Sequence, residues 1–149
     1  MRRTPYTGTI SFSSRRIEGS EGYWGKFYDV FDDSFRENLQ RALSAHKGKS
    51  IGDPWCLGFF VHNEIAWGDE VSSAISALKS PAEQPAKNVF IGDLKAKYKT
   101  INKLNAAWGT KHESWERLRQ STDAPDREKA QGDLIAFYTK ITNRYFKTI

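Results

Sequence analysis

A polar cluster, His62-Asn63-Glu64, offers the clearest acid–base chemistry in this sequence. It directly follows the apolar run Cys56–Val61, and Trp67 comes three residues after Glu64. Flanking aromatic side chains would disfavour the charged carboxylate, so the pKa of Glu64 would rise toward values useful to a general acid. Glu64 is thus placed for proton transfer. The Asn63 amide directly before it can donate to a sugar hydroxyl, and the Trp67 indole can stack against a pyranose face.

The same residues also fit a purely structural role. A glutamate near a helix N-terminus is favoured by the helix dipole, so Asn63 and Glu64 could simply open the following helix. Spacing alone gives the two interpretations about equal weight.

Other candidate residues give weaker signals. Tyr23 and Trp24 would form a sugar-stacking platform in a loop or, with equal weight, cover the core. Asp29, Asp32 and Asp33 would bind a cation, but helix capping and loop anchoring are the favoured roles.

The sequence predicts no metal ion or other cofactor. The single cysteine, Cys56, excludes an internal disulfide and any multi-cysteine zinc site. His46, His62 and His112 lack the paired spacing of metal ligands.

Composition excludes several function classes. The chain has 149 residues, 38% of them hydrophobic, and a net charge of +5. It is too apolar for a disordered protein, and no stretch approaches the roughly 20 apolar residues of a membrane span. Lysine and arginine are scattered rather than clustered, so nucleic-acid binding ranks below the other hypotheses. No export signal is evident, and the localisation stays unknown.

The elements that must position the polar cluster are few strands and many helices. A strand is expected at Thr9–Phe12, a loop at Ile17–Gly25, and a helix from the Asp32–Ser34 region to about His46, begun by a Ser34–Glu37 capping box. The run Cys56–Val61 predicts a strand buried on both faces.

Four further helices are predicted after the polar cluster. They begin near Asp69, cover Phe90–Tyr98 and Thr100–Trp108, and run from Pro125-Asp126 to the last residues. Two strands do not make a stable sheet among so many helices, and a complete eight-stranded α/β barrel needs roughly 250 residues. We therefore expect the chain either to borrow strands from a second copy or to supply only part of a larger barrel.

The segment Asp53–Gly68 resembles the fourth-strand region of clan A glycoside hydrolases, especially family 42 β-galactosidases and agarase-like family 50 enzymes. Asp29–Asp32 upstream, and Lys97–Thr110 with Ser114-Trp115 downstream, extend the resemblance in the same order. It therefore covers most of the chain from Asp29 to Ile149. It implies that residues 1–149 form one partial (β/α)8 segment, a fragment covering about strands three to four.

This resemblance implies a retaining hydrolase with Glu64 as the general acid/base and Asn63 contacting the sugar 2-hydroxyl. His62 stands where related enzymes often have aspartate, which affects local hydrogen bonding. The nucleophilic glutamate of the family lies at the seventh barrel strand, beyond any matching residue in this chain.

Two hypotheses follow from the residues and the resemblance together. The first is retaining hydrolysis of β-galactosides or agar-type polysaccharides, with His62, Asn63, Trp67 and Trp24 binding the carbohydrate. The second is a non-catalytic carbohydrate-binding or assembly protein derived from that fold. Because a partial barrel leaves strand edges unpaired, we also expect association with a second copy or with the remainder of a barrel.

Overall fold

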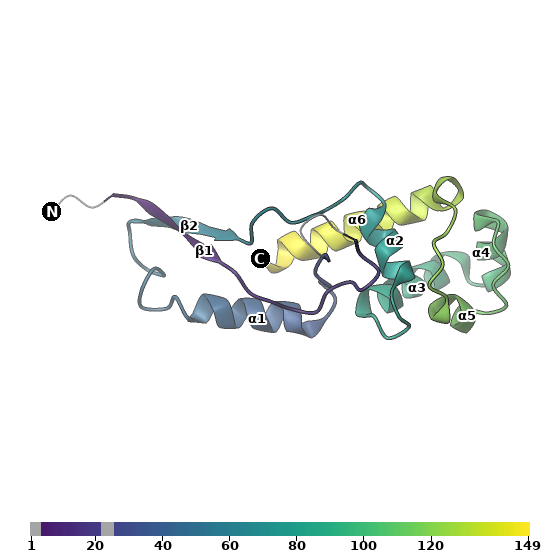
Figure 1. Cartoon of the computed structure of the whole chain (residues 1–149), viewed down its shortest axis with the longest axis horizontal. Coiled ribbons are helices and arrows are strands. Elements are labelled where there is room, and N and C mark those ends of the chain that lie inside the picture. The colour runs from purple at the N-terminus through teal and green to yellow at the C-terminus, as the bar shows by residue number, and fades with distance from the viewer. Residues whose placement is uncertain (1–3, 22–25) are drawn as a thin grey trace.

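The computed structural model describes residues 4–21 and 26–149, in two strands and six helices (Figure 1). The strands and the first helix form one end of the molecule, the helices between the second strand and the last helix form the other, and the long last helix connects the two ends. In chain order the elements are β1 (Tyr6–Ile10), α1 (Asp33–Ser44), β2 (Cys56–Val61), α2 (Ser72–Lys79), α3 (Pro85–Tyr98), α4 (Ile101–Trp108), α5 (Trp115–Gln120) and α6 (Arg127–Thr148).

The two strands are parallel and are joined through α1, so they form a βαβ unit. Their register pairs Thr7 with Gly58 and Ile10 with Val61. The last ladder hydrogen bond runs from the His62 amide to the carbonyl oxygen of Ile10, 3.0 Å away. Because the strands are parallel, both carboxyl ends lie at the same edge, next to the C-terminus of α6 (Figure 1).

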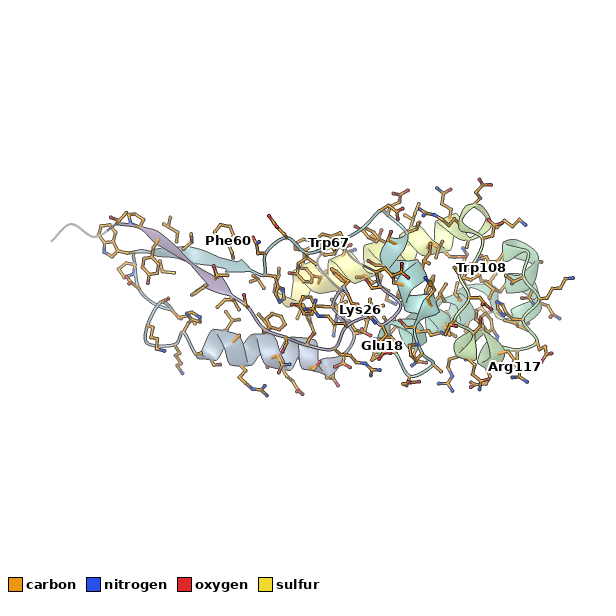
Figure 2. The ribbon with its side chains drawn as sticks, in the orientation of Figure 1. Glu18, Lys26, Phe60, Trp67, Trp108 and Arg117 are labelled. Carbon is orange, nitrogen blue, oxygen red and sulfur yellow. The ribbon has the colours of Figure 1, made fainter. Side chains whose placement is uncertain are left out.

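The expected strand at Cys56–Val61 is present, but the expectation that it is buried on both faces is wrong. Leu57 is 73% exposed and Phe60 is 64% exposed. In the described part of the chain, β2 pairs with β1 alone, and Figure 2 shows Phe60 projecting outward from the strand. An apolar run shows that the side chains of a strand suit burial. They are buried only where other strands or helices pack over the strand.

The start of α1 also differs from the expected capping box. Asp32, rather than Ser34, is the N-cap, and its carboxylate accepts a hydrogen bond from the Ser34 amide at 3.0 Å. The Ser34 hydroxyl instead accepts from the Arg15 amide, which fixes the preceding loop on the helix. Ser34 therefore anchors a distant segment.

The helical end contains the four predicted helices and one addition, but α3 begins at Pro85 and not near Phe90. Helix α4 ends at Gly109, whose φ of +68° is a left-handed conformation that suits glycine. Helix α6 begins after Asp126, whose carboxylate accepts from two backbone amides. The short helix α5 is the element that sequence periodicity did not predict.

Aromatic packing fills the core of this end. The rings of Phe90 and Phe137 stack at 4.2 Å with an interplanar angle of 3°, and Trp108 is fully buried beside Phe90. Helices α3, α4 and α6 therefore share one apolar centre. Trp115 is partly buried against the same cluster.

A buried lysine closes the ends of two helices. The Lys87 ammonium donates to the carbonyl oxygens of Ser80 at 2.6 Å and Ser121 at 2.5 Å, the C-cap residues of α2 and α5. A cation at these carbonyls complements the helix dipoles. Desolvation lowers the pKa of Lys87, so its charge depends on these carbonyl partners.

The early aspartates act as anchors, as the sequence favoured. Asp29 is buried and accepts hydrogen bonds from the Phe31 amide, the Ala86 amide and the Gln84 side chain. It thereby ties the loop after β1 to the N-terminus of α3.

Candidate functional site

The residues of the polar cluster meet in a cavity of about 290 Å³ beyond the carboxyl ends of the strands. This is the edge where parallel α/β folds place ligands. The loop before α1 supplies the opposite wall. The lining residues are Ser11, Phe12, Arg16, Lys26, Phe27, Tyr28, His62, Asn63, Glu64, Ile65 and Ala66.

An unusual backbone turn presents Glu64 to this cavity. His62 has a φ of +61° and Glu64 a φ of +47°, both in the left-handed region that non-glycine residues rarely adopt. Such conformations cost of order 1–3 kcal/mol each and concentrate at functional sites. Helix α2 begins only at Ser72, so the alternative in which Asn63 and Glu64 open the next helix is wrong.

Glu64 and Asn63 are exposed at the cavity rim. The flanking apolar groups that were expected to desolvate the carboxyl group do not enclose it, since Phe60 projects outward (Figure 2). In the described residues, the Glu64 side chain has no hydrogen-bond partner among the protein atoms. It is therefore free to meet a ligand in the cavity.

His62 lines the cavity, but both of its ring nitrogens bond within the protein. Its Nε2 lies 3.3 Å from the Phe12 carbonyl oxygen and its Nδ1 lies 3.2 Å from the Tyr145 hydroxyl. Because a carbonyl only accepts, Nε2 carries the proton and Nδ1 accepts from Tyr145. Burial raises the pKa of Tyr145 to about 12, so its hydroxyl keeps the proton that it donates.

This arrangement makes His62 a link between β1, β2 and α6. Its ring also stacks on Tyr28, with 4.4 Å between centroids. Both ring nitrogens are already bonded within the protein, so His62 lines the cavity without a free polar atom to offer a sugar. The sequence had indicated a substrate-binding histidine, and the structure gives it this linking contact.

Folding stability should fall as the pH drops below about 6.5, the ordinary pKa of histidine. Burial lowers the pKa of His62 in the folded chain, so between the two pKa values the unfolded chain binds a proton that the folded chain does not. His62→Gln should make the free energy of unfolding, measured by urea denaturation, less dependent on pH between 5 and 7.

His112 provides the comparison, because burial lowers its pKa as well. His112→Gln should remove a separate part of the pH dependence, and the double variant should remove both parts. An unchanged slope in His62→Gln would contradict the assigned protonation.

Trp67 does not join Glu64 in this cavity. Its ring stacks on Phe146 at 5.7 Å and meets Tyr145 edge-on at 5.2 Å. Its remaining surface lines a neighbouring cavity of about 430 Å³ between Gly19 and Arg127. A sugar stacked on Trp67 would therefore occupy a different place from one beside Glu64. Trp24 and Tyr23 lie outside the described residues.

Two basic residues of the cavity were missed by sequence reasoning. The Arg16 guanidinium lies 3.6 Å from the centre of the Tyr28 ring and donates to the Lys26 carbonyl oxygen at 2.8 Å. Lys26 lines the same wall. The available signal was one basic residue at each end of the loop Ile17–Gly25, and basic residues beside loops are common on protein surfaces.

Metal binding has no support in this geometry. Across residues 4–21 and 26–149, no group of three or more His, Cys, Asp and Glu side chains is placed to hold an ion. The carboxylates of Asp29 and Asp32 accept hydrogen bonds from backbone amides.

None of the helices described combines the length and apolarity needed to cross a bilayer.

The comparisons with known proteins point in one direction, although no family model matches the chain. Beta-agarase B of Vibrio sp. (strain JT0107) is 32% identical over 154 residues, which cover 95% of this chain and 16% of that protein. Beta-agarase A of the same strain is 30% identical over 142 residues, or 86% of this chain and 14% of that protein. The homologues of the present chain are therefore agarases.

The fold supports the same relationship. The solved structure of an exo-beta-agarase superposes with a TM-score of 0.86 and 28% identity, covering 97% of this chain and 21% of that one. The expected resemblance to agarases is confirmed, whereas the resemblance to family 42 β-galactosidases stays a prediction. The chain thus spans less than a quarter of each of these three agarases.

Proposed function

We propose that this chain carries the proton-donor half of an agar-degrading, retaining glycoside hydrolase. The observation that carries the proposal is the strained turn after β2, which directs Glu64 and Asn63 to a cavity within a segment homologous to agarases. The substrate would be an agar-type polysaccharide or another β-galactoside.

In the proposed mechanism, Glu64 protonates the glycosidic oxygen of the leaving group. A second carboxylate, roughly 5–5.5 Å away, attacks the anomeric carbon and forms a glycosyl-enzyme intermediate. Glu64, now ionised, then takes a proton from the water that releases the sugar. Asn63 would hold the 2-hydroxyl of the same sugar, and Trp67 would stack a further ring in the neighbouring cavity.

The nucleophile is not among the described residues that line this cavity, where Glu64 is the sole carboxylate. Asp69 is already engaged by Arg127 at 2.6 Å and by Ser72 at the start of α2. We therefore propose that hydrolysis needs a carboxylate supplied from outside the residues described.

The parallel βαβ unit and the similarity to part of an agarase support a partial (β/α)8 architecture for residues 1–149 as a single domain. Strands β1 and β2 would be adjacent barrel strands, and their free edges would pair with strands of the remaining barrel or of a second copy. The exposed apolar side chains Leu57 and Phe60 favour such a partner. Sedimentation at rising protein concentration would measure self-association.

A non-catalytic carbohydrate-binding or assembly protein is the second candidate. The lone carboxylate of the cavity favours it for this chain taken alone, because retaining hydrolysis requires two. Binding without turnover would be its signature.

The isolated chain should therefore bind an agar-derived tetrasaccharide and release no product from it. Asn63→Ala should weaken binding by about tenfold, the effect of losing one hydrogen bond worth about 1.4 kcal/mol. Calorimetric titration measures the affinity, and reducing-sugar release measures turnover.

Asn102→Ala is the matched control, because Asn102 is exposed on α4 and lies outside this cavity. Turnover by the isolated chain would contradict the proposal that the nucleophilic carboxylate comes from outside the described residues. Absence of binding, or equal binding by both variants, would contradict the proposed carbohydrate site.

A further inference from the structure

We propose that the Glu64 cavity recognises a galactan bearing an anionic substituent, a sulfate ester or a carboxylate, through Arg16 and Lys26. The inference rests on the proposed function for the sugar part of the ligand, and it adds the charge of the substituent. Arg16 and Lys26 belong to the wall of the cavity that faces the turn after β2.

The Arg16 guanidinium is held in place before any ligand arrives. Stacking on Tyr28 fixes its plane, and a hydrogen bond to the Lys26 carbonyl oxygen fixes its rotation. An arginine has five N–H donors, and within residues 4–21 and 26–149 this is the one hydrogen bond that the Arg16 side chain donates, so its other donors can meet a ligand. A planar guanidinium with free donors suits the two oxygens of a carboxylate or sulfate.

The nearby acids leave Arg16 unpaired. Glu18 and Asp32 both lie within 4 Å of Arg15, the preceding residue, at 3.9 and 3.8 Å. In the described part of the chain, neither Arg16 nor Lys26 forms an ion pair.

The charges lining the cavity are therefore unbalanced. Arg16 and Lys26 stand against the single carboxylate of Glu64, and no other acid lines the cavity among the described residues. His62 adds no charge near neutral pH, because burial lowers its pKa. The excess grows when Glu64 holds a proton, which is the state that the proposed proton donor needs. An anionic substituent would offset it.

The size of the cavity limits the ligand to a small group. Its volume of about 290 Å³ is at the lower end of ligand pockets, which start near roughly 300 Å³. One sugar ring with one substituent is the unit that such a space holds. Further rings of a polysaccharide would extend past the open rim.

The test compares three agar-derived tetrasaccharides by calorimetric titration of the chain. One is neutral, one bears a single sulfate ester, and one bears a single carboxylate introduced by oxidation of a primary hydroxyl. We expect at least one charged ligand to bind about tenfold more tightly than the neutral one, as for one charge-assisted hydrogen bond. The stronger of the two identifies the substituent.

Two variants assign this preference to the cavity. Lys26→Met removes an exposed cation, and Arg16→Lys keeps the charge while removing the planar donors. Both should reduce the preference for the charged ligand and leave the affinity for the neutral ligand within about twofold, the scatter of such comparisons. Arg41→Met, on the exposed surface of α1, lowers the net charge by the same one unit as Lys26→Met and should not change the preference.

The possible outcomes separate this inference from the proposed function. Equal binding of all three ligands would overturn the inference and leave the carbohydrate site in place. A preference that survives both Arg16→Lys and Lys26→Met, or that Arg41→Met also removes, would reflect overall charge and would equally overturn it. Absence of binding by every ligand would overturn both.

Discussion

Replacing Glu64 by glutamine should lower agarose hydrolysis by about 10²- to 10⁴-fold, the usual contribution of a general acid–base group. The measurement uses beta-agarase B in which the homologous segment has been exchanged for this chain, so that the relative supplies the rest of the protein. Glutamine preserves the size of the side chain and removes only its ability to transfer a proton.

The loss should depend on the leaving group. An aryl β-galactoside with an acidic phenol departs with little protonation, so Glu64→Gln should retain most of the first step on that substrate. A sugar leaving group needs the proton and should show the full decrease.

Glu70→Gln supplies the control. Glu70 is an exposed acid six residues further along and does not line the Glu64 cavity. Similar activity loss in both variants, or equal loss on both classes of substrate in Glu64→Gln, would contradict the proposed role. Circular dichroism of each exchanged protein shows whether it has folded.

Local patterns in the sequence were enough to predict most elements. Apolar spacing and turn residues located β2, α3, α4 and α6, and the predicted end of α4 at Trp108 agrees with the structure. These features depend on residues within one turn or one strand of each other. Helix α5, only six residues long, has too few turns for a periodic signal.

The site was predictable in outline and not in detail. The break from apolar to polar residues after Val61 located Glu64 and Asn63 at the cavity. The hydrogen bond from Tyr145 to His62 joins residues 83 positions apart, and no local pattern reports such a contact. The separation of Trp67 from Glu64 likewise follows from its packing on α6.

Charged residues on apolar helix faces were the missed signal. In α6, Asp133 occupies the face formed by Ala130, Leu134, Phe137 and Ile141, and in α3 Lys87 occupies the face of Ile91 and Leu94. A charge at such a position predicts a buried polar contact, because an unpaired buried charge is costly. Both residues are in fact buried and fully bonded.

Asp133 holds three helices together at one carboxylate. It accepts from the Lys97 ammonium at 2.6 Å, the Tyr98 hydroxyl at 2.7 Å and the Trp108 indole at 2.9 Å. Desolvation alone would raise the pKa of Asp133, but these donors outweigh it and lower the pKa. The same bond raises the pKa of Lys97, so both partners favour the charged pair.

Asp133→Ala should accordingly lower the free energy of unfolding by about 1–3 kcal/mol, the usual cost of leaving a buried hydrogen-bond donor without its acceptor. The substitution leaves the buried Trp108 indole without an acceptor and the Lys97 ammonium without its counter-charge. Asp133→Asn should lose less, because an amide oxygen still accepts from Trp108. Urea denaturation measures both, and the Trp108 indole proton resonance reports the loss of its hydrogen bond.

The exposed pair between Asp93 and Lys140 provides a matched control, since it also joins α3 to α6, at 2.7 Å. Both side chains are about half exposed, and such pairs contribute about 0–1 kcal/mol. Asp93→Ala should therefore barely change the denaturation midpoint. If Asp93→Ala and Asp133→Ala proved equally mild, burial would not be what gives the Asp133 contacts their strength. The helical end would then depend on apolar packing around Phe90 and Phe137 alone.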